Sequence, residues 1–225
     1  MTFSILVFDP ITNSFGGASA TGNICVGAWV LRAEPFSGVS ASQGADPSTL
    51  WGENVLRYSN KGLSAEDAIT KTIQEDSGKD RRQISLIDKS GNGSVFSGMS
   101  NSPIIDEIVS ENIVLSGNIL SNKNVLASMK LAYEKNHDVE LVERLYLSLL
   151  EGANAGGDRR GLFSASILVV NENKPPISLR VDYSKKPLKK LKKIIDKTNE
   201  KSYSNWLKFL PVISNPYNSE ENKKS

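Results

Sequence analysis

The stretch Thr2–Val30, TFSILVFDPITNSFGGASATGNICVGAWV, decides the fold. Residues 2–8 place apolar side chains on both faces of an extended segment, which is typical of a strand that is covered on both sides. Asp9-Pro10 and residues 12–14 supply turn chemistry, and the second segment, 15–20, consists largely of Gly, Ala and Ser. If the two segments pair as a hairpin, Thr2 lies opposite residues 21–23, at a strand end that faces a glycine-containing loop.

Thr2 at this position predicts a nucleophile. Removal of Met1 would leave Thr2 with a free α-amine, which titrates near pH ~8 and can accept the proton of the neighbouring hydroxyl. A threonine activated by its own N-terminal amine is an established form of covalent catalysis. The alternative is that Met1 stays, or that Thr2 is only a β-branched strand residue.

The composition limits the function classes. The chain has 225 residues, of which 39% are hydrophobic, enough for one large domain with or without an appendage. One Cys excludes an internal disulfide, and one Cys with one His leaves no zinc cluster, so we expect neither a metal nor a cofactor. The N-terminus lacks the features of a secretory signal, and no apolar run approaches the ~20 residues of a membrane span. We therefore expect a cytoplasmic protein.

The order of the predicted elements indicates the fold class. After the first hairpin, strands are expected over residues 24–31, 37–42, 82–88, 94–98, 112–120, 163–171 and 177–183. Helices are expected over residues 48–60, 64–73, 122–136 and 139–151. Strand groups therefore alternate with helix pairs that can each cover one sheet face. This order predicts an α+β fold, a four-layer αββα sandwich of two mostly antiparallel sheets.

The C-terminal part differs in charge from the rest. Residues 185–225 contain 11 Lys and 4 acidic residues, whereas the whole chain has a net charge of +2. Leu188, Leu191 and Ile195 recur at helical spacing among the lysines. Such a helix can bind RNA or an anionic membrane, or it can dock on the body and leave its lysines in solvent. We favour docking and expect no nucleic-acid partner. The predicted organisation is a body over 1–184, a packed basic extension over 185–218 and a disordered tail over 219–225.

Three polar residues are candidates to assist Thr2. Asn118, at a predicted strand break, is a candidate oxyanion donor, a role that side-chain amides serve; it can equally be a turn residue that binds local backbone. Thr21 and Asn23 can hydrogen-bond the terminal amine, or they can close the loop. The single His137 is expected to be exposed between two helices, which argues against a Ser-His-Asp triad.

Charged residues near strand entrances are candidate substrate ligands. Asp158 and Arg160 lie in the polar loop GANAGGDRRG over 152–161, where a guanidinium can bind a substrate carboxylate in a bidentate manner. The alternative is an internal Asp–Arg pair that braces the loop. The pair Arg82-Gln83 begins a predicted strand and can serve in either way.

Five motifs carry a resemblance to a known family. They are the opening TFSI with its DP-x-T turn, DPSTLWGENVLRYSNKGLSAEDAI (46–69), DRRQISLIDKSG (80–91), SGNIL (116–120) and AGGDRRGLFSASILVV (155–170). In this order they resemble the domain-of-unknown-function family 1028, whose fold is similar to that of the N-terminal-nucleophile (Ntn) hydrolases. The resemblance implies an αββα sandwich with the nucleophile at the first residue of its first strand. The chain departs from the family pattern at Ser116 and Phe163.

Two functions follow as expectations. The first is an Ntn-type amidohydrolase that cleaves a small amide or peptide with Thr2 as the nucleophile. The second is a catalytically inactive Ntn-like module that binds a ligand or supports assembly. The sequence leaves open whether the protein is a homo-oligomer.

Overall fold

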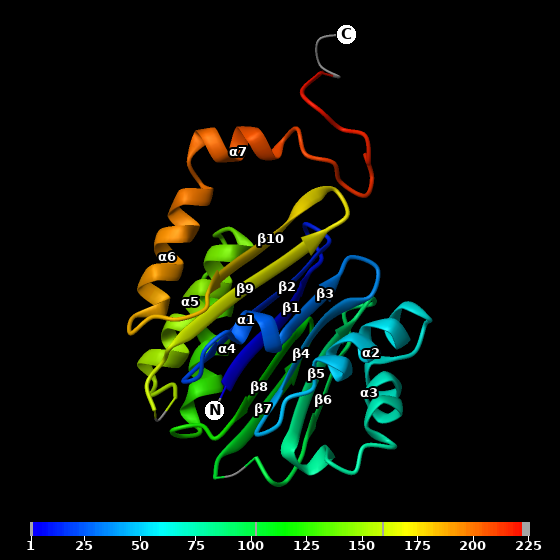
Figure 1. The fold of residues 1–225 in the computed structure, drawn as a ribbon, viewed down its shortest axis with the longest axis vertical. Coiled ribbons are helices and arrows are strands. Elements are labelled where there is room, and N and C mark those ends of the chain that lie inside the picture. The colour runs from blue at the N-terminus through cyan, green and yellow to red at the C-terminus, as the bar shows by residue number, and fades with distance from the viewer. Residues whose placement is uncertain (1, 102, 159, 222–225) are drawn as a thin grey trace.

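The fold is built on two antiparallel sheets that pack face to face. The structure, a computed structural model, describes residues 2–101, 103–158 and 160–221, and within these ranges it contains a six-stranded and a four-stranded sheet (Figure 1). The strand order of the larger sheet is β10 (Lys174–Val181), β9 (Ser164–Asn171), β2 (Ser14–Thr21), β1 (Thr2–Asp9), β8 (Ile113–Asn118) and β7 (Ile105–Ser110). The order of the smaller sheet is β3 (Leu31–Glu34), β4 (Gly38–Gly44), β5 (Arg82–Asp88) and β6 (Gly93–Ser97).

Helix pairs cover the outer face of each sheet. On the smaller sheet these are α2 (Thr49–Asn60) and α3 (Ala65–Ile73), and on the larger sheet α4 (Asn124–Lys135) and α5 (Leu141–Asn154). The hydroxyls of Ser48 and Ser64 cap α2 and α3, where each accepts a hydrogen bond from a backbone N–H of the first turn. A 3₁₀ turn, η1 (Lys79–Arg81), precedes β5. The predicted four-layer α+β sandwich is therefore confirmed.

β1 lies inside the larger sheet and is buried on both faces. Phe3, Ile5 and Val7 contact the core beneath α4 and α5, whereas Leu6 belongs to the core between the sheets. This division follows from the two-residue repeat of a strand, which sends alternate side chains to opposite faces. The hairpin pairs β1 with β2 in the predicted register, so that Thr2 is opposite Thr21.

One predicted strand is wrong. Residues 24–31 form a loop followed by the short helix α1 (Val26–Trp29), and β3 begins only at Leu31. Val26 and Val30 are four residues apart, about one helical turn, and both side chains enter the core between the sheets. Cys25 precedes α1 with a left-handed backbone (φ 61°) and is partly exposed rather than buried within a strand.

The predicted strand over 112–120 is shorter in the structure. It ends at Asn118, because Ile119 adopts a left-handed backbone (φ 57°) that cannot continue a strand. Its edge partner, β7, was not predicted. The sequence IDEIVS of β7 alternates poorly, since its residues are only partly buried at the edge of the sheet.

The C-terminal part docks through one helix. In α6 (Pro187–Thr198) the side chains of Leu188, Leu191 and Ile195 are buried while most lysines are exposed. α7 (Lys201–Leu207) follows at one end of the molecule, away from the N-terminus (Figure 1). The predicted boundary at residue 185 stays a prediction, and residues 222–225 of the predicted tail lie outside the described residues. None of the helices in the described part of the chain has the length and apolar character that a membrane crossing requires.

Candidate functional site

Three polar residues form a row across the centre of the larger sheet. Thr2 begins β1, Thr21 ends β2 and Asn118 ends β8, and the register places Thr2 directly opposite both neighbours. Side chains at directly opposite positions project to the same face with Cβ atoms about 4.5–5.5 Å apart. The hydroxyl of Thr2 donates a hydrogen bond to Oγ1 of Thr21 over 3.2 Å. The strand ends thus bring three of the predicted site residues together.

The side-chain amide of Asn118 is buried without hydrogen-bond partners among the described residues. Its residue is 0% exposed, and neither Nδ2 nor Oδ1 of its side chain has a hydrogen-bond partner among the described residues. A buried amide without partners costs about 1–3 kcal/mol of stability. The alternative that Asn118 satisfies local backbone as a turn residue is therefore not what the structure shows. The donor and the acceptor of this amide are therefore unpaired at a buried position directly beside Thr2.

A pair of buried glutamines fixes the backbone of this row. Gln43 on β4 donates to the carbonyl oxygen of Thr2 over 3.3 Å and to Oε1 of Gln83 over 2.7 Å. Gln83 on β5 in turn donates to the carbonyl oxygen of Gly117 over 3.2 Å. The smaller sheet therefore holds the main chain at Thr2 and next to Asn118. Sequence analysis placed Gln43 just beyond a predicted strand and missed it, and it named Gln83 only together with Arg82.

Thr2 lines a pocket of about 300 Å³. Its polar lining residues are Thr2, Thr21, Asn23, Gln43 and Arg160. Its apolar lining residues are Ile24, Val26, Trp29, Val30, Ala45, Pro47 and Ile119, and Gly44 completes the lining. Thr2 and Thr21 therefore reach this cavity, whereas Asn118 is fully buried and does not line it. The volume is at the lower end of the range for small-molecule sites.

Two residues with strained backbone flank the pocket. Ile119 lines it with φ 57°, and Cys25, between the lining residues Ile24 and Val26, has φ 61°. A left-handed backbone at a residue other than Gly costs about 1–3 kcal/mol and is concentrated at functional sites. The strain at Ile119 directly follows Asn118, so it fixes the end of β8 at the position where the amide faces Thr2.

Asp158 and Arg160 form the predicted internal pair, and Arg160 also reaches the pocket. The side chain of Asp158 is fully buried; it accepts hydrogen bonds from Nε of Arg160 over 3.2 Å and from Nη2 over 2.9 Å. The same carboxylate accepts from the backbone N–H of Gly22, where a Cβ would collide with it. Asn23 is exposed at the pocket and its Oδ1 accepts from the N–H of Ile24.

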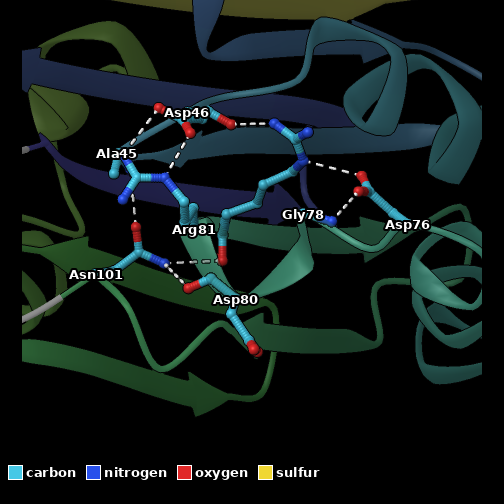
Figure 2. Close-up of polar contacts among 8 residues, drawn as sticks. Ala45, Asp46, Asp76, Gly78, Asp80, Arg81 and Asn101 are labelled. Atoms are coloured by element: carbon cyan, nitrogen blue, oxygen red, sulfur yellow. Dashed lines mark hydrogen bonds and ion pairs between the residues drawn. The ribbon is translucent and has the colours of Figure 1, made fainter.

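Arg82 lies in a different network, behind one wall of the pocket. Its Nε binds Asp76 over 2.9 Å, and its Nη1 donates to the carbonyl of Asp46. Figure 2 shows Arg81 and Asn101 converging on the same segment: Arg81 binds the carboxylate of Asp46, and Asn101 accepts from the N–H of Ala45. The hydrogen bond from Arg81 lowers the pKa of the Asp46 carboxyl below its usual range. This network braces the loop that supplies Ala45 and Pro47 to the pocket.

Other chemistries have no comparable cluster. Within the described ranges, no group of three His, Cys, Asp or Glu side chains could hold a metal ion. His137 is exposed, as predicted, and lies near Asp9, at the opposite end of β1 from Thr2. The polar row at Thr2 is therefore the candidate active site.

Comparisons with known proteins identify the family but no activity. A search among curated proteins found no match. Among solved structures, a crystal structure of a Silicibacter pomeroyi protein, described as a DUF1028 family member, matches with a TM-score of 0.92 and 39% identity. The alignment covers 97% of this chain and 95% of that one. The model of the family of unknown function DUF1028 matches residues 2–191. The chain belongs to the DUF1028 family.

Proposed function

We propose that the protein is an Ntn-type amidohydrolase that cleaves a small amide or peptide, with Thr2 as the nucleophile. The observation that carries this proposal is the row in which Thr2 and Thr21 line a pocket and the unpartnered amide of Asn118 lies buried beside Thr2. A nucleophile, an oxyanion donor and space for a substrate are three requirements of acyl transfer. The αββα layers, with Thr2 at the first position of a central strand, support the likeness to Ntn hydrolases.

The reaction would proceed in two balanced steps. After removal of Met1, the α-amine of Thr2 accepts the hydroxyl proton while Oγ1 attacks the amide carbonyl carbon. Nδ2 of Asn118 donates a hydrogen bond to the oxyanion, a contribution of about 3 kcal/mol in known cases. The C–N bond then breaks and the leaving nitrogen takes the proton from the terminal ammonium. Water attacks the resulting ester, which releases the carboxylic acid and restores the hydroxyl.

The neighbours of Thr2 suit this role. The Oγ1 atom is already oriented by Thr21 over 3.2 Å, and Gln43 holds the carbonyl of the same residue over 3.3 Å. A nucleophile fixed by supporting hydrogen bonds loses little freedom in the transition state. Met1 lies outside the described residues, so its removal is the first point to test.

The test combines intact mass with turnover. We expect the active preparation to begin at Thr2 by intact mass and to hydrolyse members of an amide and peptide library. Thr2→Ala should reduce turnover by at least about 10³-fold, as loss of a nucleophile does, while Thr2→Ser keeps measurable activity. Thr70→Ala, at an exposed position of α3, is the matched control and should be unaffected. Full activity with Met1 retained, or in Thr2→Ala, would end the proposal.

A second candidate function is a catalytically inactive binding or assembly module. The exposed aromatic side chains of α7 favour it. In α7 no residue is buried, and Tyr203 and Trp206 expose 40% and 52% of their surfaces. Exposed aromatic side chains that lie close together are typical of interaction surfaces. If the library gives no turnover from protein that begins at Thr2, this second function replaces the first.

A further inference from the structure

The pocket beside Thr2 has a strongly apolar wall. Ile24 and Trp29 each leave 52% of their surface exposed, although both are large apolar residues, and both line the pocket. Ile119 and Pro47 continue this lining. Large apolar side chains that remain exposed around a cavity mark a site for an apolar ligand group.

Arg160 supplies the charge of the pocket. Among the described lining residues it is the one with an ionisable side chain, and 49% of its side chain is exposed. The buried carboxylate of Asp158 binds its Nε and Nη2 atoms and thereby fixes the plane of the guanidinium. A guanidinium that is held in place by an internal partner loses little side-chain entropy when it binds a ligand.

The two features lie on one small cavity of about 300 Å³, which limits the ligand to a few functional groups. An apolar group on the Ile24–Trp29 wall and an anion at Arg160 would occupy it together with the amide at Thr2. A carboxylate matches a guanidinium in shape and charge. An N-acylated amino acid with a bulky apolar side chain carries all three groups at adjacent positions.

We propose that the substrate is an N-acyl derivative or short peptide of an apolar amino acid, whose free carboxylate binds Arg160 and whose side chain packs against Ile24 and Trp29. This inference rests on the proposed function for the identity of the scissile amide. The recognition itself does not require catalysis, so it can be measured by itself. The guanidinium selects for the carboxylate, and the apolar wall selects for the bulky side chain.

The experiment measures binding to the Thr2→Ala protein by calorimetry, so that no probe is turned over. The probes are N-acetylphenylalanine, its C-terminal carboxamide and N-acetylglycine. We expect N-acetylphenylalanine to bind at least about ten-fold more tightly than either of the others, as the loss of one charge-assisted contact or one apolar group implies. Arg160→Gln should abolish the preference over the carboxamide, and Trp29→Ala the preference over N-acetylglycine.

Arg57→Gln, at an exposed position of α2, is the matched control and should keep both preferences. Equal affinities of the acid and the carboxamide, an acid preference that survives Arg160→Gln, or no binding of any probe would each overturn the inference. Its failure is distinct from failure of the hydrolase. Selective binding without turnover by the wild-type protein would leave the recognition intact and end the hydrolase, whereas turnover of uncharged amides unaffected by Arg160→Gln would do the reverse.

Discussion

The two ends of β1 face the same space between the sheets but have opposite characters. At the Thr2 end, the layer contains hydroxyls and amides: Ser4 bonds to Ser19 over 3.0 Å and to Gln43 over 2.6 Å. At the other end, Leu6 belongs to an apolar cluster, and the rings of Phe8 and Phe15 stack at 4.8 Å. One strand thus contributes to a polar half and an apolar half of a single layer.

The difference shows where stability and chemistry reside. A satisfied buried hydrogen bond adds only about 1 kcal/mol net, whereas a buried leucine side chain adds about 2–3 kcal/mol. The polar half therefore stabilises the packing of the two sheets less than an apolar layer would. The polar half holds Thr2 and Asn118 in place, and the stability of the apolar half offsets its smaller contribution.

The largest effect on stability should come from breaking the apolar half. Leu6→Ala removes a fully buried side chain from the core between the sheets and should lower the free energy of unfolding by about 2–5 kcal/mol. Ser4→Ala, two residues away on the same face, should cost only about 1–2 kcal/mol through its lost hydrogen bonds. Urea denaturation of both variants measures the difference. Equal costs would mean that the two halves do not differ in this way.

A second variant separates stability from activity within the polar half. Asn118→Leu replaces the unpartnered amide by an apolar side chain of similar size, so the free energy of unfolding should stay unchanged or rise, by up to about 1–3 kcal/mol. Turnover should fall by about 10²–10³-fold, because the oxyanion donor is lost. Thermal unfolding and amide hydrolysis are measured on the same sample. A destabilised variant that keeps full activity would show that Asn118 is a structural residue.

The smallest effect on stability concerns a titratable side chain outside both halves, because the Thr, Ser, Gln, Asn, Leu and Phe side chains named for this layer do not ionise. Burial of Tyr133, on α4 behind the larger sheet, raises its pKa from 10.0 to about 12. Since the folded state binds this proton more tightly, its contribution to stability is complete below pH ~10 and is lost as the pH rises towards 12. Tyr133→Phe should reduce this alkaline loss by about 1 kcal/mol near pH 11. Denaturant titrations at pH 8 and 11 measure it, and identical losses in both proteins would refute the assignment.

Short-range sequence patterns predicted the elements that depend on periodicity and turn residues. The pairing of Thr2 with Thr21 follows from one hairpin turn, and the helices predicted over 48–60 and 64–73 follow from a few neighbouring residues. Residues 24–31 were assigned wrongly because their apolar, β-branched composition suits a strand. The structure has α1 here, with Val26 and Val30 buried in the layer between the sheets, an environment that depends on both sheets and not on local composition.

The residues of the candidate site also fall into those that the sequence indicated and those that only the structure brought together. Thr2, Thr21, Asn118 and Arg160 could be proposed from residue type and position, and the structure brings all of them to the row or its pocket. Arg82 has the same residue type as Arg160, but it points into the network around Asp46 and Asp76. The contact between Gln43 and Gln83 was missed, because they are 40 positions apart and meet only when β4 and β5 pair.

By itself, the sequence determined the alternation of strands and helix pairs, the first hairpin and the presence of a hydroxyl residue at its start, because these depend on periodicity and turn chemistry over short distances. Only the tertiary structure decided that Asn118 would lose its hydrogen-bond partners, that Trp29 would stay exposed at a pocket and that Arg160 would be held beside it. Burial and pairing between distant segments are properties of the packed chain, and no local pattern encodes them.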